Sequence, residues 1–258
     1  MKILVCVKSV PSPESRFRIN ASGTGYDESG LTFHVNEYDL YAMEEAARIK
    51  ERFGDVSITV VSVGPPRVVE QVRKAMGLGA EEGAVIDDSE APAGDALAAA
   101  ALLANWARAE RYDLVLCGVM SENMQRGATG PMLAELLHLP CATTVIAERI
   151  EDGRKSILCE RELEGGVRER VRLPLPALIT VQSGINAPRY ASLSNVLRAK
   201  GREVPVIKAA ELGGAARRSE AVRRAYLHKR SGACEILTGD LDTMAEKLAE
   251  RIRARVPR

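Results

Sequence analysis

Short apolar runs rich in β-branched residues alternate with longer segments of helical periodicity over the first 147 residues. This alternation is typical of βαβ units, so we predict an α/β fold with a mostly parallel twisted sheet and helices on both faces. The predicted strands are Ile3–Val7, Ser57–Val63, Gly83–Ile86, Asp113–Cys117 and Thr143–Ala147, and the predicted helices are Tyr38–Phe53, Arg67–Met76, Gly94–Glu110 and Thr129–Leu137.

Two segments interrupt this rhythm. Phe17–Asn20 and Leu31–Val35 alternate apolar and polar residues around a glycine-rich loop, which predicts an inserted hairpin. After residue 148, three strand-like runs follow one another with short turns between them: Ser156–Leu163, Val167–Leu173 and Leu178–Gln182. We expect them to form an antiparallel meander that extends the edge of the sheet.

The C-terminal third has a different texture. From Gly184 to about Arg230 the chain is rich in Gly, Pro and Arg with weak periodicity, and a helix is predicted from about Asp240 to Arg253. We therefore divide the chain into an α/β domain with its antiparallel extension at 1–183, an irregular loop and arm at 184–230, and a C-terminal strand and helix at 231–258. A long irregular stretch usually serves as a binding surface.

Charged residues cluster on the first predicted helix. Glu44, Glu45, Arg48, Lys50 and Glu51 have the spacing of i,i+4 pairs. We expect them to form a solvated face with a structural role only.

Composition narrows the function classes. Lys and Arg number 36 against 35 Asp and Glu, a net charge of +1 that creates no overall field for nucleic acid. Five cysteines without C-x-x-C spacing are expected to be reduced, and three histidines far apart offer neither a zinc site nor a catalytic triad. Neither an export signal nor a membrane span is expected, which favours a cytoplasmic protein.

One loop has the features of an anion site. G-x-G-x-x-G and Walker patterns are absent, but Gly118–Gly130 follows a predicted strand and leads into the helix Thr129–Leu137. Its glycines permit close backbone approach, Thr129 could cap the helix, and the free N–H groups at the helix N-terminus favour a phosphate. A plain glycine-tolerant βα loop is the alternative.

Other segments are expected at the same edge of the sheet. Cys6-Val7-Lys8 ends the first strand, and Ser62-Val63-Gly64 ends the second, where an adenine face could fit. Asn36 precedes the first helix, so we expect it to cap that helix, with contact to a ribose hydroxyl as the alternative.

Three stretches carry a resemblance to a known family. They are Lys2–Lys8 with Val35-Asn36 and Ala42–Ala46, the spaced pattern Arg161-x-x-Glu164-Gly165-Gly166-x-x-Glu169-x-Val171 with Pro176-x-Leu178-Ile179-Thr180, and Gly184–Asn195 with Arg198-Ala199-Lys200. In this order they resemble the β subunit of the electron transfer flavoproteins, over essentially the whole chain.

The resemblance implies a heterodimer with an α subunit that holds a redox-active FAD, while this chain binds AMP, forms one wall around the flavin and does no covalent chemistry. The nucleotide contacts that it implies are Cys6, Asn36, Glu37, Tyr38, Asp39, Val63, Gly118, Asn123, Met124, Gln125, Arg126, Gly127, Ala128 and Thr129.

The chain departs from the family pattern in the nucleotide loop. Asn123-Met124-Gln125-Arg126 stands where many relatives have acidic residues, and Glu37 replaces a usual proline. Fewer acids and an added arginine favour negative charge, so a second FAD in this subunit is the alternative to AMP. Pro13 stands where some relatives have an aromatic ring, which makes stacking on the flavin from this side doubtful.

The resemblance also implies docking of a flavin dehydrogenase, of the acyl-CoA dehydrogenase type, through Arg189, Tyr190 and an exposed Leu193. Read from the residues alone, Leu193 would be the first buried residue of a helix capped by Ser192 or Ser194. The basic run Arg217, Arg218, Arg223, Arg224, Lys229 and Arg230 is expected to pack as an arm along the α subunit, as is the C-terminal helix.

Three function classes follow. The first is the electron carrier subunit, with a bifurcating form that holds a second FAD and takes electrons from NADH as its variant. The second is a stand-alone adenine-nucleotide sensor. The third is an enzyme, for which the chain offers no nucleophile–base pair or metal cluster.

Overall fold

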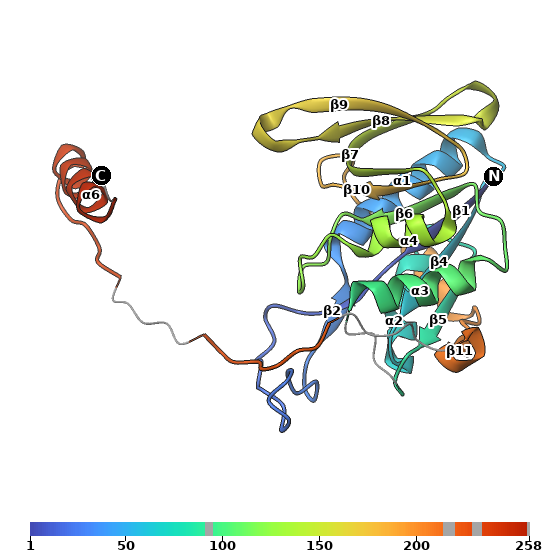
Figure 1. Ribbon diagram of the computed structural model, residues 1–258, viewed down its shortest axis with the longest axis horizontal. Coiled ribbons are helices and arrows are strands. Elements are labelled where there is room, and N and C mark those ends of the chain that lie inside the picture. Colours follow the sequence, from blue (N-terminus) through green and yellow to red (C-terminus); the bar gives the residue numbers. More distant parts are fainter. Residues whose placement is uncertain (91–94, 214–219, 229–233, 257–258) are drawn as a thin grey trace.

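The computed structural model describes residues 1–90, 95–213, 220–228 and 234–256. Within these residues nine strands form one sheet, with the order β11-β5-β4-β1-β6-β10-β7-β8-β9 (Figure 1). Their bounds are β1 Lys2–Cys6, β4 Ser57–Val63, β5 Glu82–Asp87, β6 Leu114–Gly118, β7 Cys141–Ile150, β8 Ser156–Glu162, β9 Arg168–Pro174, β10 Ala177–Val181 and β11 Val206–Lys208. Neighbours from β11 to β7 are parallel, and β7, β8 and β9 are antiparallel.

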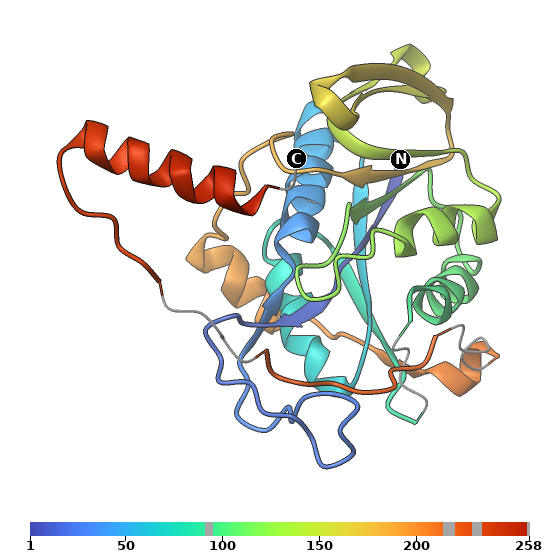
Figure 2. The same ribbon diagram turned by 60° about the vertical axis from the view of Figure 1, so that its left-hand side comes forward.

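Helices cover both faces of this sheet, as predicted. The long helices are α1 Glu37–Phe53, α2 Val69–Met76, α3 Ala96–Ala107, α4 Thr129–Leu137, α5 Leu193–Lys200 and α6 Leu241–Arg255. Helices α1, α2 and α5 share one apolar core, and α3 and α4 share the other. Along β1 the side chains alternate between them, with Ile3 and Val5 in the first core and Leu4 and Cys6 in the second. Figure 2 shows the sheet between α1 and the pair α3 and α4.

The third strand of the expected meander lies elsewhere. β8 and β9 extend the edge, but β10 returns to the sheet between β6 and β7 and runs parallel to both. All five of its residues are buried. A continuous apolar run of this kind is typical of an interior parallel strand, whereas an edge strand alternates.

The inserted hairpin also has other partners than expected. β2 Ser9–Pro11 pairs antiparallel with β3 Phe33–Val35, and Phe17–Asn20 contributes only a bridge from Ile19 to Tyr26. The segment directly after β1 therefore pairs with the segment directly before α1. The glycine-rich residues between them form a long loop.

The last third contains more regular structure than the weak periodicity indicated. Helix α5 begins after Ser192, whose hydroxyl accepts a hydrogen bond from the N–H of Asn195, and β11 joins the far edge of the sheet. Helix α6 stands apart from the body in both views, and none of its residues is buried (Figures 1 and 2). Residues 234–240 before it are irregular. Gly94, Arg217, Arg218, Lys229 and Arg230 lie outside the described residues.

Candidate functional site

A pocket lies where β1, β4 and β6 end and α4 begins. The order of the sheet reverses at this point, because the chain builds outward from β1 through β4 and β5 and then continues on the other side with β6. Such switch points leave a crevice at the carboxyl ends of parallel strands. The predicted residues that line this pocket are Cys6, Asn36, Asp39, Val63, Gly118, Met124, Arg126, Gly127, Ala128 and Thr129.

Four other predicted contacts, Glu37, Tyr38, Asn123 and Gln125, are not among the residues that line it. The structure adds residues to the wall that the sequence did not predict: Asp88, Asp95, Ala96, Ala99, Leu103 and Cys117. Val7 and Lys8 were expected at this edge, and Val119, Met120, Ser121 and Gly130 belong to the loop that was expected to bind the anion. A signal existed for Asp88, which follows a predicted strand of the same sheet.

Asp39 ties the strand ends together beneath the pocket. Its Oδ2 accepts a hydrogen bond from the N–H of Lys8 at 2.7 Å, and its Oδ1 accepts one from the N–H of Gly118 at 3.0 Å. Burial raises the pKa of Asp39 to about 7, against the opposing effect of these N–H groups and of Asn36. A Cβ on Gly118 would lie 2.4 Å from Asp39 Oδ1, so glycine permits this close approach.

Asn36 has a different role from the cap that was predicted. It occupies the position before α1, but its side chain makes no capping bond. Instead its Nδ2 donates to the carbonyl of Met120 and its Oδ1 accepts from the N–H of Glu122, both at 2.9 Å. Asn36 is 1% exposed, so these hydrogen bonds to the loop after β6 are shielded from water.

The first turn of α4 offers free backbone donors to the pocket. The helix begins at Thr129 after Ala128, and no side chain caps it, which corrects the expected capping role of Thr129. Gly127 has φ +62°, in the left-handed region, and a Cβ on Gly130 would lie 2.5 Å from Thr180 Cγ2. The N–H groups of a first turn without a side-chain cap, together with the helix dipole, favour an anion here.

Two cations lie at the pocket. Lys8 Nζ donates to Asn123 Oδ1 at 3.0 Å and to Ser121 Oγ at 3.3 Å, and burial lowers its pKa. Asn123 therefore contributes by holding Lys8. Arg126 forms an ion pair with Glu220 from the C-terminal arm, with 2.5 Å between Nη1 and Oε2.

Two thiols form part of the pocket wall. Cys6 and Cys117 are paired in the register of β1 and β6, and both side chains are buried. The hydrogen bond that Cys117 shares with Cys6 and the burial of the thiol raise the pKa of Cys117. The cysteines of the described residues are free.

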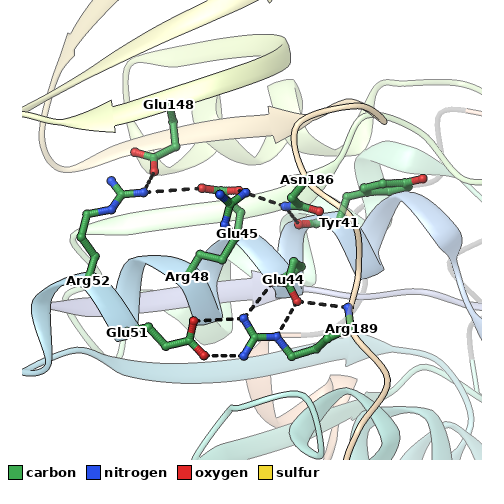
Figure 3. Close-up of polar contacts among 9 residues, drawn as sticks. All are labelled: Tyr41, Glu44, Glu45, Arg48, Glu51, Arg52, Glu148, Asn186 and Arg189. Atoms are coloured by element: carbon green, nitrogen blue, oxygen red, sulfur yellow. Dashed lines mark hydrogen bonds and ion pairs between the residues drawn. The ribbon is translucent and has the colours of Figure 1, made fainter.

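The expected docking residues divide into two groups. Tyr190 is 100% exposed and Leu193 is 75% exposed, although Leu193 opens helix α5, where the residue-based alternative expected it to be buried. The Arg189 side chain points toward Glu44 and Glu51 of helix α1 (Figure 3). Its Nε and Nη2 donate to Glu44 at 2.7 and 2.8 Å, its backbone N–H donates to Glu44 at 3.2 Å, and its guanidinium also binds Glu51.

The charged face of α1 is only in part the solvated face that the sequence predicted, because Arg48 and Glu51 are exposed and Lys50 is half-buried. Glu44 and Glu45 are both buried. Asn186 Nδ2 donates to Glu45 Oε2 at 2.9 Å and to the carbonyl of Tyr41 at 3.0 Å, which adds a second attachment of the segment before α5 (Figure 3). Helix α1 therefore holds the segment from Asn186 to Arg189 in place through these hydrogen bonds and ion pairs.

A third carboxylate, Glu148 of β7, joins the same cluster. Arg52 Nη2 lies 2.9 Å from Glu148 Oε1 and 4.0 Å from Glu45 Oε1. The Glu148 side chain is 0% exposed. Burial raises its pKa to about 7; Arg52 opposes this rise and Glu45 adds to it.

This raised pKa predicts a pH dependence of stability. Between the usual glutamate pKa and about 7 the folded chain retains a proton that the unfolded chain releases, so the free energy of unfolding should fall as pH rises through this window. The free energy of unfolding should differ between about pH 5.5 and pH 7.5, and Glu148→Gln should reduce that difference by about 2 kcal/mol. Urea unfolding at both pH values measures it. An equal pH difference in both proteins would contradict this assignment.

Among the described residues, no three His, Cys, Asp or Glu side chains are grouped so as to hold a metal ion. None of the described helices is both long and apolar enough to cross a membrane.

Comparison with known proteins adds independent information. The pattern of the family described as "Electron transfer flavoprotein domain" matches residues 24–212. The chain is 35% identical to "Electron transfer flavoprotein subunit beta" of Methylophilus methylotrophus, over 98% of both chains. It is 36% identical to the protein of the same name from Bos taurus over 83% of each chain, and 30% identical to that of Bacillus subtilis (strain 168) over 98% of each.

Proposed function

Because this chain belongs to the electron transfer flavoprotein β-subunit family, we propose that it is one half of a heterodimeric electron carrier that binds AMP in the pocket at the start of α4. The α subunit holds the redox-active FAD, and this chain contributes a wall of the flavin site and the docking surface for the electron donor. It is a carrier subunit and performs no bond-making chemistry itself.

The observation that carries the nucleotide assignment is the uncapped first turn of α4 at the switch point of the sheet. A Cβ on Gly118 would collide with Asp39 and Tyr38, and one on Gly130 would collide with Thr180, so glycine lets the backbone at the pocket approach α1 and β10 closely. Backbone N–H groups and the helix dipole stabilise a phosphate without a dedicated cation. Cys6 and Val63 offer an apolar surface to the base.

The ion pair between Arg126 and Glu220 favours AMP over a second FAD. The arginine that could attract a further phosphate is already opposed by the Glu220 carboxylate. A bifurcating carrier, with FAD in this subunit and NADH as donor, is the competing arrangement. A stand-alone nucleotide sensor is disfavoured by the exposed apolar residues of α6 described below.

Denaturing the purified heterodimer tests this assignment. We expect one AMP and one FAD per heterodimer, quantified by chromatography of the released nucleotides. Two FAD with reduction by NADH would select the bifurcating arrangement. FAD as the sole released nucleotide, at one per heterodimer, would remove the AMP proposal.

The C-terminal helix supports the α-subunit partnership. Leu241, Leu248 and Ile252 lie on α6, and each is more than half exposed. Apolar side chains at this spacing form a stripe that is normally covered by a partner. The α subunit is the occupant that we propose, with the arm that contains Arg223 and Arg224 beside it.

Free cysteines are consistent with a cytoplasmic heterodimer.

We assign donor docking to the tip formed by Tyr190 and Leu193. A single apolar side chain on a small surface suits a partner that must dissociate in each cycle, because small interfaces are weak. The donor class is a flavin dehydrogenase, of the acyl-CoA dehydrogenase type.

Leu193→Ala should slow reduction of the heterodimer by its donor dehydrogenase at least about tenfold, since such an anchor contributes more than 1.4 kcal/mol. Flavin content and reduction by dithionite should be unchanged. Leu197→Ala is the matched control, because Leu197 is also exposed on α5 but lies one turn further from the tip. An unaltered rate for Leu193→Ala would exclude the anchoring role.

A further inference from the structure

The ion pair between Arg126 and Glu220 joins two distant parts of the chain at the pocket. Arg126 lies on the pocket wall, in the loop that precedes α4. Glu220 lies in the arm that leads toward α6. Their side chains are 29% and 50% exposed, so the pair is at the rim of the pocket, in contact with water.

The backbone of Glu220 is attached to another part of the pocket wall. Its N–H donates to Asp95 Oδ2 at 3.3 Å, and Asp95 lines the pocket. The other oxygen of Asp95 caps α3 by accepting the N–H of Ala98 at 2.6 Å. Glu220 therefore contacts the loop before α4 with its side chain and the start of α3 with its backbone.

The same arm has a second attachment further along. The N–H of Ala225 donates to the carbonyl of Gly23 at 2.7 Å. Figure 2 shows this segment, in orange-red, along the end of the molecule that also carries the loop around Gly23. Two attachments hold the arm beside the pocket, so the position of the Glu220 carboxylate is supported by more than its own ion pair.

We propose that Glu220 is a specificity-determining residue that restricts the pocket to nucleoside monophosphates. One phosphate is stabilised by the backbone donors of α4. A second phosphate would bring further negative charge to a rim where Glu220 already neutralises Arg126 and repels anions. Like charges disfavour one another even in partly exposed settings. This inference rests on the proposed AMP site and explains how the chain tolerates an arginine in its nucleotide loop.

Glu220→Gln tests the proposal with little change in shape. The heterodimer of this chain and its α subunit is unfolded, freed of nucleotide and refolded with FAD and equal concentrations of AMP and ADP. The incorporated nucleotides are then released and quantified. Because the change removes one negative charge from the rim of the pocket, the ADP to AMP ratio should rise about fivefold over that of the unaltered protein.

Glu235→Gln is the matched control. Glu235, in the segment before α6, is also an exposed carboxylate paired with an arginine, Arg251 at 2.9 Å, but it is not among the residues that line the pocket. Its ratio should equal that of the unaltered protein. Adding Arg126→Gln to Glu220→Gln should return the ratio toward the original value.

The outcomes separate this inference from the function on which it rests. An unchanged ratio for Glu220→Gln, with AMP still incorporated, would overturn the role of Glu220 and leave the AMP site in place. A protein that refolds with FAD and incorporates neither AMP nor ADP would overturn both.

Discussion

Replacing Gly118 with alanine should lower the free energy of unfolding of the chain by about 3 kcal/mol. The added Cβ would lie 2.4 Å from Asp39 Oδ1 and 2.7 Å from the backbone of Tyr38. Neither neighbour is a flexible side-chain end, because the Asp39 carboxylate is bound to two backbone N–H groups. The start of α1 must therefore move away from β6, and the pocket must change shape with it.

Urea unfolding and nucleotide content measure the two consequences of Gly118→Ala. We expect AMP in the purified heterodimer to fall below about one tenth of its original occupancy, since about 1.4 kcal/mol of binding free energy is a tenfold loss. Gly201→Ala is the control, because its Cβ would lie 3.7 Å from the carbonyl of Arg198 and its backbone φ is −80°. Similar stability and AMP content in Gly118→Ala and in the unaltered protein would show that the close approach is unimportant.

Replacing Arg189 with alanine should have an effect of similar size on stability. The change removes a guanidinium that binds Glu44 and Glu51 and leaves the Glu44 carboxylate buried without its cation. Loss of one partner of a buried ion pair costs about 3 kcal/mol or more. Arg189→Lys should recover only part of this loss, because lysine cannot reproduce the two-sided fork.

A second consequence of Arg189→Ala concerns the donor. Tyr190 and Leu193 lie within four residues of Arg189. Without the attachment of Arg189 to α1 they should bind the dehydrogenase more weakly, and the heterodimer should be reduced more slowly. Flavin content should be preserved. Arg48→Ala is the control, since Arg48 lies on α1 as Glu44 does, but pairs with Glu45 at 3.6 Å from an exposed position. A stable Arg189→Ala protein with an unaltered rate would separate Arg189 from docking.

Patterns along the chain predicted the parallel part of the fold well. The strands β1, β4, β5 and β6 and the helix α4 were expected close to their actual bounds, because hydrophobic periodicity is a local property. The glycine loop before α4 was predicted to bind an anion, and in the structure it forms part of the pocket wall. Resemblance then supplied the family, which the comparisons confirm.

Two predictions failed because they concerned distant partners. The apolar run of β10 indicated burial, but its place between β6 and β7 depends on which neighbours are available when the sheet assembles. The hairpin prediction likewise identified Leu31–Val35 as extended without finding its partner, Ser9–Pro11. Alternation specifies which side of a strand is apolar and leaves the pairing open.

The sequence by itself therefore determined the α/β class, the place of the glycine loop before α4 at the carboxyl edge of the sheet, and the family. Only the tertiary structure decided what the charges do. Glu44 of α1 is buried in an ion pair with Arg189, which is 145 positions away in the chain, and Arg126 is neutralised by a carboxylate from the C-terminal arm. The physical reason is that the sequence does not show whether water or a counter-ion surrounds a charged side chain. For Glu44 and Arg126 the counter-ion comes from a distant part of the chain, which only the tertiary structure brings near.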